Sequence, residues 1–380
     1  MALDAARELL PDVITLTTRL AEVSAPTGDE QARSLFVRNW LSECGFTEIW
    51  SDDLGDVVST APGTRPGRPV LIAAHLDTVF RAGTDLTVTR SGNRLSGPGV
   101  GDNSLGIAAL LTLPVMLGRL ELRPEVDLML ALTVGEEGLG NLRGIRAVFD
   151  AFPDVGAAIA LEGHNLGRVT HMAVGSRRVK IVAMGPGGHS WGAFGQPNAI
   201  HALANIIAEL DALPLSESPK TTLSVGLIEG GVSVNTIAPT ASCIVDMRST
   251  DAAALAKLAD RVERIVRDAG RGGIATEHLV LGERPAGTVS RKSRIVEVAT
   301  DVLASLGIDA IRDASSTDAN IPISLGIPAI CLGITDGGNA HREDEYIEIE
   351  PIATGLTQLL LISLRLAEDS AASAATSAAD

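Results

Sequence analysis

Short runs of consecutive apolar residues alternate with amphipathic stretches along the first half of the chain. The runs PVLIAAHLD (69–77), VDLMLALTVGEE (126–137) and AAIALEG (157–163) predict buried strands. The segment GDNSLGIAALLTLPVML (101–117) has a helical pattern that begins at Asp102 and Asn103. Buried strands separated by helices predict an α/β fold with a central, mostly parallel sheet and helices on both faces.

The pattern changes near residue 176. From there to about residue 286 the order of predicted elements is strand, helix, strand, strand, helix, strand. This β-α-β-β-α-β order is that of a ferredoxin-like α+β domain. We therefore expect a main domain built from 1–175 and 286–368, interrupted by an inserted domain at 176–285. The small residues of 369–380 offer nothing to bury and predict a disordered tail.

Composition excludes several classes of protein. Lys and Arg total 31 and Asp and Glu total 47, for a net charge of −16, and aromatic residues make up 3%. Such a chain lacks the basic surface that nucleic acids and anionic membranes require, so neither is expected as a partner. The apolar run Leu105–Leu117 contains Pro114 and is too short to span a bilayer. Three widely spaced cysteines and an N-terminus without a signal-peptide pattern predict a cytoplasmic location.

Ionisable side chains collect where predicted strands and loops end. They are His75, Asp102, Glu136 with Glu137, Glu162 and His341. Ligands of open α/β sheets bind beyond the carboxyl ends of the strands, and ionisable groups there are costly unless paired or metal-bound. Each has an ordinary interpretation alone: His75 as a core histidine, Asp102 as a helix N-cap, and Glu136–Glu137 as a solvated turn. Their convergence is what favours a metal centre.

Together these residues can hold two divalent cations. One set is His75, Asp102 and Glu162, and the other is Asp102, Glu137 and His341, with Asp102 shared. Imidazole and carboxylate ligands favour Zn²⁺, with Co²⁺ or Mn²⁺ as alternatives.

Two further carboxylates have supporting roles in this hypothesis. Adjacent side chains on an extended backbone face opposite ways, so Glu136 can act as general base on a shared water while Glu137 faces a metal. Asp77 lies two residues after His75 and can accept its second imidazole N–H.

Five motifs carry a family resemblance. They are HLDTV (75–79), GPGVGDNSLG (97–106), GEEGLGN (135–141), LEG (161–163) and GGNAHREDEY (337–346). In order and spacing they resemble the di-zinc peptidases of the aminoacylase, carboxypeptidase G and tripeptide aminopeptidase group. The resemblance implies the same ligands, Asp77 as a supporting residue, Glu136 as the base, and a cis peptide bond between Asp102 and Asn103. It also implies that the inserted domain is a lid that forms a homodimer.

The resemblance adds candidates in the lid. His189 in GPGGHS resembles a lid histidine that stabilises the oxyanion, although alone it would be a surface turn histidine. Asn235 and Arg248 resemble substrate-binding positions, and the alternative for Arg248 is a pair with Asp246. In the main domain, SSTDANI (315–321) resembles a loop lining the substrate pocket of tripeptide aminopeptidases. His164 is treated as structural, although it is close enough to Glu162 to be a rival ligand.

The expected function is a zinc-dependent hydrolase that cleaves an amide bond in short peptides, as a di- or tripeptidase or a carboxypeptidase-like enzyme. Glu162 and the TDAN sequence favour a peptidase. The alternative is an N-acyl amino acid deacylase on the same site. A non-catalytic metal-dependent binding protein is disfavoured because Glu136 is present. A dinucleotide-binding oxidoreductase is disfavoured because GPGVGD lacks the GxGxxG spacing.

Overall fold

The computed structural model describes residues 1–377 and divides into two compact units. Unit 1 comprises Met1–Met172 and the chain from Thr288 onward, and unit 2 is Ala173–Gly287. The sequence prediction placed the two boundaries at 175/176 and 285/286.

Unit 1 is built on a nine-stranded sheet with the order β1-β2-β6-β3-β7-β17-β8-β15, in which β16 also pairs with β8. The strands are β1 (Ile49–Ser51), β2 (Val57–Ala61), β3 (Val70–His75), β6 (Leu128–Thr133), β7 (Ala157–Glu162), β8 (Arg168–Ala173), β15 (Gly287–Thr288), β16 (Ile311–Ser315) and β17 (Ala329–Gly333). The central strands β6, β3, β7 and β17 are parallel, whereas β2 and β8 pair antiparallel at their flanks. The predicted mostly parallel sheet is therefore confirmed.

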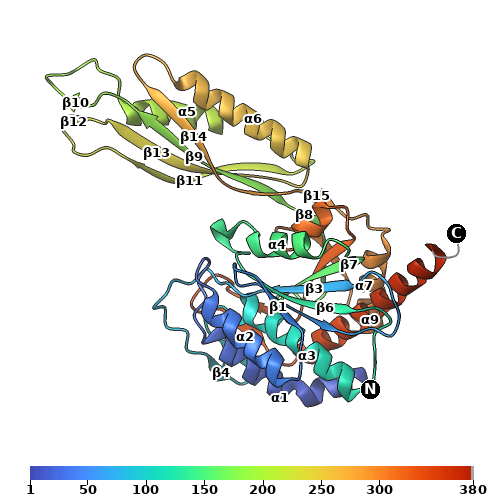
Figure 1. Cartoon of the computed structure of the whole chain (residues 1–380). Helices are drawn as coiled ribbons and strands as arrows, with labels where there is room; N and C mark the ends of the chain where they lie inside the picture. The colour runs from blue at the N-terminus through green and yellow to red at the C-terminus, as the bar shows by residue number, and fades with distance from the viewer. Residues whose placement is uncertain (378–380) are drawn as a thin grey trace. The chain divides into compact units, whose positions relative to one another are not determined.

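Helices cover the sheet because its central strands are apolar on both faces. Figure 1 shows α4 (Arg143–Ala151) on one side and α1 (Ala2–Ala21) with α3 (Gly106–Arg119) on the other. The remaining helices of unit 1 are α2 (Gln31–Glu43), α7 (Arg294–Ser305), α8 (Asn320–Ser324) and α9 (Ile352–Ser377). The interior of unit 1 is one continuous cluster of aliphatic side chains from the sheet and these helices.

The helical stretch Val100–Arg119 is long and apolar enough to cross a membrane by length and composition. It includes the predicted run Leu105–Leu117 and extends beyond it at both ends. In the structure 83% of its most apolar window is buried, and α3 contacts β3, α1 and α9. Its apolar character is therefore accounted for by the core of unit 1.

A second, four-stranded sheet in unit 1 has the order β18-β19-β5-β4. Its strands are β4 (Thr89–Ser91), β5 (Arg94–Ser96), β18 (Gly337–Gly338) and β19 (Tyr346–Glu348). Tyr346 of β19 pairs with Ser96 of β5. This pairing brings the loop after β5, which leads to Asp102, beside the loop between β18 and β19, which carries His341.

Unit 2 has the expected β-α-β-β-α-β order. Its elements are β9 (Gly175–Met184), α5 (Ala199–Asp211), β11 (Thr221–Gly230), β13 (Thr240–Ser249), α6 (Ala252–Ala269) and β14 (Ala275–Arg284). The antiparallel sheet runs β11-β13-β9-β14 and packs against both helices through an aliphatic core. Asn198 and Asp251 cap α5 and α6 by accepting N–H bonds of the first turn. A two-stranded sheet joins β10 (Gly188–His189) to β12 (Thr236–Ile237).

The predicted disordered tail is wrong for the residues that the structure describes. Helix α9 continues to Ser377, so residues 369–377 are helical, whereas 378–380 lie outside the described residues. Ala is the strongest helix former, and Ala371 is buried in the core while the Ser370 hydroxyl donates to the Arg68 carbonyl. A small side chain can thus be buried where a helix passes close to its neighbours.

Candidate metal centre

Three neighbouring parallel strands bring several of the predicted ligands to one edge of the sheet. His75 is the last residue of β3, Glu162 is the last residue of β7, and Glu136 and Glu137 follow β6. The order β6-β3-β7-β17 places these strand ends side by side. Since the strands are parallel, all of these side chains reach the same edge.

Asp102 lies between two histidines. Its Oδ1 is 3.1 Å from Nε2 of His75, and its Oδ2 is 3.0 Å from Nε2 of His341. Glu162 Oε2 lies 3.6 Å from the His75 nitrogen, and Glu137 Oε1 lies 2.9 Å from the His341 nitrogen. Within each of these two sets of three residues, the potential ligand atoms all lie within 4.8 Å of one another.

The electrostatics of the cluster favour cations. Burial, helped by the neighbouring Asp102 and Glu137 carboxylates and opposed by His75, raises the pKa of Glu162 to about 7. Hydrogen bonds to Asp102 and Glu137 raise the pKa of His341 to about 11. Burial opposes ionisation of Asp102, but its two histidines hold its pKa below the usual value. Buried carboxylates crowded in this way need positive charge between them.

The donor set fits a pair of divalent ions. Asp102 Oδ1 is buried and makes no hydrogen bond of good geometry, as expected of an atom whose partner is a metal. Imidazole nitrogen and carboxylate oxygen in sets of three leave room for a further ligand, which is typical of catalytic zinc sites. The residues that would hold the ions are His75, Asp102 and Glu162 on one side, and Asp102, Glu137 and His341 on the other.

The backbone at the centre is unusual in two places. The peptide bond between Asp102 and Asn103 is cis, which confirms the prediction from the resemblance. His341 has a φ of 66°, in the left-handed region that non-glycine residues seldom adopt. A left-handed φ at a non-glycine residue such as His341 is found most often at functional sites, where the surrounding structure holds it in place.

The contact between Asp77 and His75 differs from the predicted one in the atom of Asp77 that lies closer to the imidazole. The His75 Nδ1 lies 3.0 Å from the backbone oxygen of Asp77 and 3.5 Å from its carboxylate, so the shorter contact is to the main chain. The carboxylate instead accepts the backbone N–H groups of Glu136 and Glu137, each at 2.9 Å, and the Thr27 hydroxyl at 2.9 Å. Asp77 therefore fixes the turn that carries the two glutamates.

Glu136 is buried at this turn with 6% of its surface exposed. One of its carboxylate oxygens lies within 4.8 Å of potential ligand atoms of His75 and Glu137. An additional carboxylate therefore lies next to His75, which belongs to the first set of potential ligands.

The lid candidates lie in unit 2. Pairing of β10 with β12 brings His189 opposite Thr236, and the Ser190 N–H donates to the Asn235 carbonyl, so His189 and Asn235 are neighbours. Arg248 lies on β13, and its Nε donates to Asp246 at 2.7 Å. This pair with Asp246 is the alternative that the sequence left open for Arg248.

Sequence reasoning missed several supporting side chains. Arg33 of α2 is fully buried and donates to the carbonyls of Leu76 and Val23, which holds the chain around Asp77. Glu345 is also fully buried, and its Oε1 accepts a hydrogen bond from Nε2 of His164 at 2.8 Å, so the His164 ring faces Glu345. The only available signal for Glu345 was its position four residues after His341.

Residues 317–321 of the SSTDANI segment are buried inside unit 1. Thr317, Asp318 and Asn320 have little exposed surface. The Asp318 carboxylate accepts a hydrogen bond from the Thr133 hydroxyl at 2.6 Å, at the end of β6. This contact supports the strand that leads to the two glutamates.

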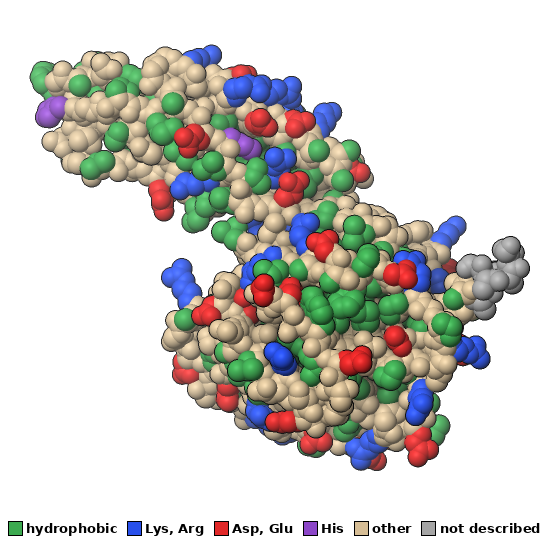
Figure 2. Space-filling model, in the orientation of Figure 1, with side chains coloured by type: hydrophobic (Ala, Val, Ile, Leu, Met, Phe, Trp, Pro, Cys, Tyr) green, Lys and Arg blue, Asp and Glu red, His purple; other side chains and the backbone are tan. Residues whose placement is uncertain are grey.

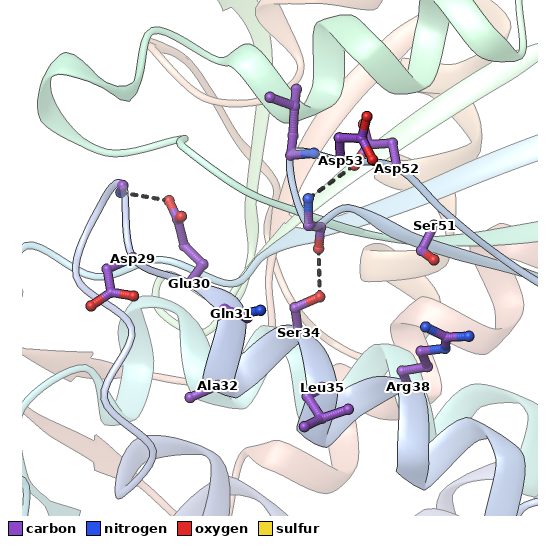
Figure 3. A pocket seen from close by; sticks show the side chains of 13 residues that line it. Asp29, Glu30, Gln31, Ala32, Ser34, Leu35, Arg38, Ser51, Asp52 and Asp53 are labelled. Atoms are coloured by element: carbon purple, nitrogen blue, oxygen red, sulfur yellow. Dashed lines mark hydrogen bonds between the residues drawn. The ribbon is translucent and has the colours of Figure 1, made fainter.

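A separate surface pocket of about 760 Å³ lies beside the start of α2 and the turn between β1 and β2. Figure 3 shows Asp29, Asp52 and Asp53 around it, while Glu30 is turned back to the Gly28 N–H. The pocket is formed by residues of 28–55, none of which belongs to the cluster of carboxylates and imidazoles.

An α/β sheet with this double ligand set at its carboxyl edge defines a metal-dependent hydrolase. The comparison with known families is consistent with the geometry: the model for Peptidase family M20/M25/M40 matches residues 71–364. The chain belongs to this family, and it is a metal-dependent amide hydrolase.

Similar proteins extend over nearly the whole chain. A succinyl-diaminopimelate desuccinylase of Corynebacterium glutamicum is 26% identical over 355 residues, which cover 91% of this chain and 94% of the relative. A tripeptidase structure from Staphylococcus aureus superposes with a TM-score of 0.81 at 19% identity, covering 94% of this chain and 99% of that one. A Bacillus subtilis structure described as a dinuclear metal binding peptidase of the M20 family has a TM-score of 0.72 at 16% identity, covering 95% and 99%.

Proposed function

We propose that this protein is a di-zinc peptidase that cleaves an amide bond in short peptides. The observation that carries the proposal is the position of Asp102, whose two oxygens face Nε2 of His75 and Nε2 of His341 at 3.1 and 3.0 Å. A carboxylate between two imidazoles, with Glu162 and Glu137 completing the sets, matches the donors that a pair of Zn²⁺ ions takes.

Bound in these two sets, divalent ions polarise a carbonyl and make water a better nucleophile at neutral pH. The protein's own side chains then have to transfer a proton from the water to the leaving nitrogen and stabilise the negative charge that develops on the carbonyl oxygen. Glu136 removes a proton from the water as the water oxygen bonds to the scissile carbon, and it delivers that proton to the leaving nitrogen when the C–N bond breaks. Asp77 keeps Glu136 in place through its bond to the Glu136 N–H.

His189 is suited to stabilise the oxyanion. Its Nδ1 lies 3.2 and 3.3 Å from the N–H groups of Trp191 and Gly192 and accepts from them. In the neutral ring the proton therefore lies on Nε2, which can donate to a developing negative charge. We propose that Asn235, beside His189, contacts the substrate as well, and that the partly exposed Arg248 binds a substrate carboxylate.

An N-acyl amino acid deacylase is the second candidate. The observation that favours it is the similarity to the Corynebacterium glutamicum protein, which is named as a desuccinylase. Both reactions hydrolyse an amide bond, so the same metal ligands and base serve either. A panel of di- and tripeptides and N-acyl amino acids separates them: we expect the highest kcat/KM for peptides, and a preference for acyl amino acids would establish the alternative.

Assembly as a homodimer through unit 2 is part of the proposal. Large hydrophobic side chains are exposed on unit 2, and Figure 2 shows such side chains on its surface. Leu227 and Ile228 are each 62% exposed on β11, which is an edge strand of its sheet. An apolar edge strand is a template for pairing, and two copies can pair through the same edge about a twofold axis.

We also propose that the protein works in the cytoplasm. Cys44, Cys243 and Cys331 are all free thiols, which suits a reducing compartment. The net charge of −16 supports a small-molecule substrate in preference to nucleic acid or a membrane surface.

The test of the proposed function is Glu136→Gln. The amide cannot accept and return a proton, so we expect hydrolysis to fall by a factor of about 10²–10⁴ while the metal content is unchanged. Glu121→Gln, at an exposed turn after α3, is the control and should retain full activity. Unchanged turnover in Glu136→Gln would show that the base is wrongly assigned. Full activity after exhaustive chelation would contradict the metal centre itself.

A further inference from the structure

One fully buried carboxylate, Glu345, binds the backbone of the loop that leads to Asp102. Its Oε2 accepts the N–H of Gly99 at 3.0 Å. Its Oε1 accepts the N–H of Gly101 at 2.9 Å and the N–H of Asp102 itself at 2.8 Å. Charge-assisted bonds of this kind are stronger than neutral ones, and their loss would leave backbone donors unpaired in a buried site.

The same carboxylate also contacts a histidine near a different ligand. His164 Nε2 lies 2.8 Å from Glu345 Oε1, and His164 is two residues after Glu162. The imidazole fits closely between two glycines: a Cβ on Gly101 would lie 2.2 Å from its Nε2, and a Cβ on Gly337 would lie 2.5 Å from its Nδ1. The position of the ring is therefore fixed by the loops on both sides.

Glu345 itself belongs to the segment that carries His341, another proposed ligand. It is four residues after His341, and its own backbone oxygen accepts the N–H of Gly97. One side chain thus connects the segments of Asp102, Glu162 and His341. Both sets of metal ligands draw on these segments.

We propose that Glu345 is a positioning residue that sets the orientation of Asp102 between the two metal ions. The inference rests on the proposed function, because it assigns Asp102 the shared position. Glu345 itself is not a ligand: both of its oxygens are occupied by N–H donors from the loop and by His164. It acts by holding the backbone of Asp102 and the His341 loop at a fixed separation.

The experiment is Glu345→Gln, measured by metal binding. A glutamine keeps the size of the side chain but offers one accepting oxygen and an NH₂ group that cannot accept, so at least one loop N–H loses its partner. Metal-free protein is titrated with Zn²⁺ against a competing chelator, and the absorption spectrum of the Co²⁺-loaded protein is recorded. We expect Zn²⁺ affinity to fall by a factor of about 10–100 and the Co²⁺ spectrum to change.

The matched control is Glu343→Gln, two residues earlier in the same loop. Glu343 is exposed, and its variant should bind Zn²⁺ and give a Co²⁺ spectrum like the wild type. Wild-type affinity and spectrum in Glu345→Gln would overturn the inference while leaving the proposed function intact. A wild-type protein that binds no metal would instead refute the proposed function.

Two variants of His164 test the same inference if Glu345→Gln does not fold. His164→Gln keeps an N–H donor for Glu345, whereas His164→Leu removes it. If Glu345→Gln fails to fold, we expect His164→Leu to weaken Zn²⁺ binding and His164→Gln to restore it in part. Equal Zn²⁺ affinity in both His164 variants and the wild type would overturn the inference.

Discussion

The Asp77 carboxylate accepts the backbone N–H of Glu136, with 2.9 Å between nitrogen and Oδ1. The segment that carries His75, a proposed metal ligand, therefore also fixes the turn that carries Glu136, the proposed base. Burial opposes ionisation of Asp77, but the adjacent His75 ring and the hydrogen bonds from these backbone groups keep its pKa below the usual value. Asp77 thus remains charged in a position where an uncompensated charge would be costly.

Asp77→Asn should lower kcat by a factor of about 10–100, because the amide group cannot accept both backbone N–H bonds and the turn shifts. The measurement is steady-state hydrolysis of the best peptide substrate together with metal content. Asp85→Asn, on an exposed loop after β3, is the control and should behave like the wild type. Equal kcat for Asp77→Asn and the wild type would show that the turn does not depend on this carboxylate.

Asp56 makes the stability of unit 1 depend on pH. The residue is fully buried just before β2, and its Oδ1 accepts the Val134 N–H at 2.8 Å while its Oδ2 has no hydrogen-bond partner. Burial is the main cause that raises its pKa to about 8, and the charges of Asp52 and Asp318 account for part of that shift. The folded pKa is therefore above the unfolded one of about 4. Its contribution to stability is present below pH 4 and is lost as the pH rises to 8.

Asp56→Asn keeps the acceptor for Val134 and stays neutral at every pH. We expect a higher melting temperature than the wild type at pH 8, equivalent to about 1–3 kcal/mol, with the difference shrinking toward pH 4. The check is a series of thermal melts between pH 4 and pH 9, with Asp53→Asn at an exposed position as the control. A difference that stays constant across this range would contradict the assigned pKa.

If β11 forms the proposed dimer interface, a charged side chain on this strand should weaken the dimer. Leu227→Glu places a carboxylate in the exposed apolar edge of unit 2 and should reduce the mass in solution from that of two chains to that of one. Light scattering after size exclusion measures this. Leu325→Glu, at a 59% exposed position in unit 1, should remain dimeric. A wild-type protein with the mass of one chain would refute the proposed assembly.

Part of the proposed centre could be predicted from the sequence because two of its ligands end apolar strands. His75 and Glu162 follow runs so apolar that an ionisable residue stands out, and parallel strands necessarily bring such residues to one edge. The inserted domain was predictable for a different reason, since the β-α-β-β-α-β order of its predicted elements differs from the alternation of strands and helices before it.

Other features depend on tertiary contacts that no local pattern reveals. In HREDEY, Asp344 forms an exposed pair with Arg342, whereas Glu345 is fully buried, and nothing in the two side chains distinguishes them. The helical extension of α9 was missed because burial of Ala371 depends on packing between distant segments. The Asp77 contact differed in detail because backbone oxygens compete with carboxylates for the same imidazole N–H.

The central claim is that two metal ions share Asp102. Anomalous difference maps from crystals containing Zn²⁺, recorded above and below the zinc absorption edge, test it most directly. We predict two peaks per chain, one among His75, Asp102 and Glu162 and one among Asp102, Glu137 and His341. A single peak, or peaks away from Asp102, would contradict the account.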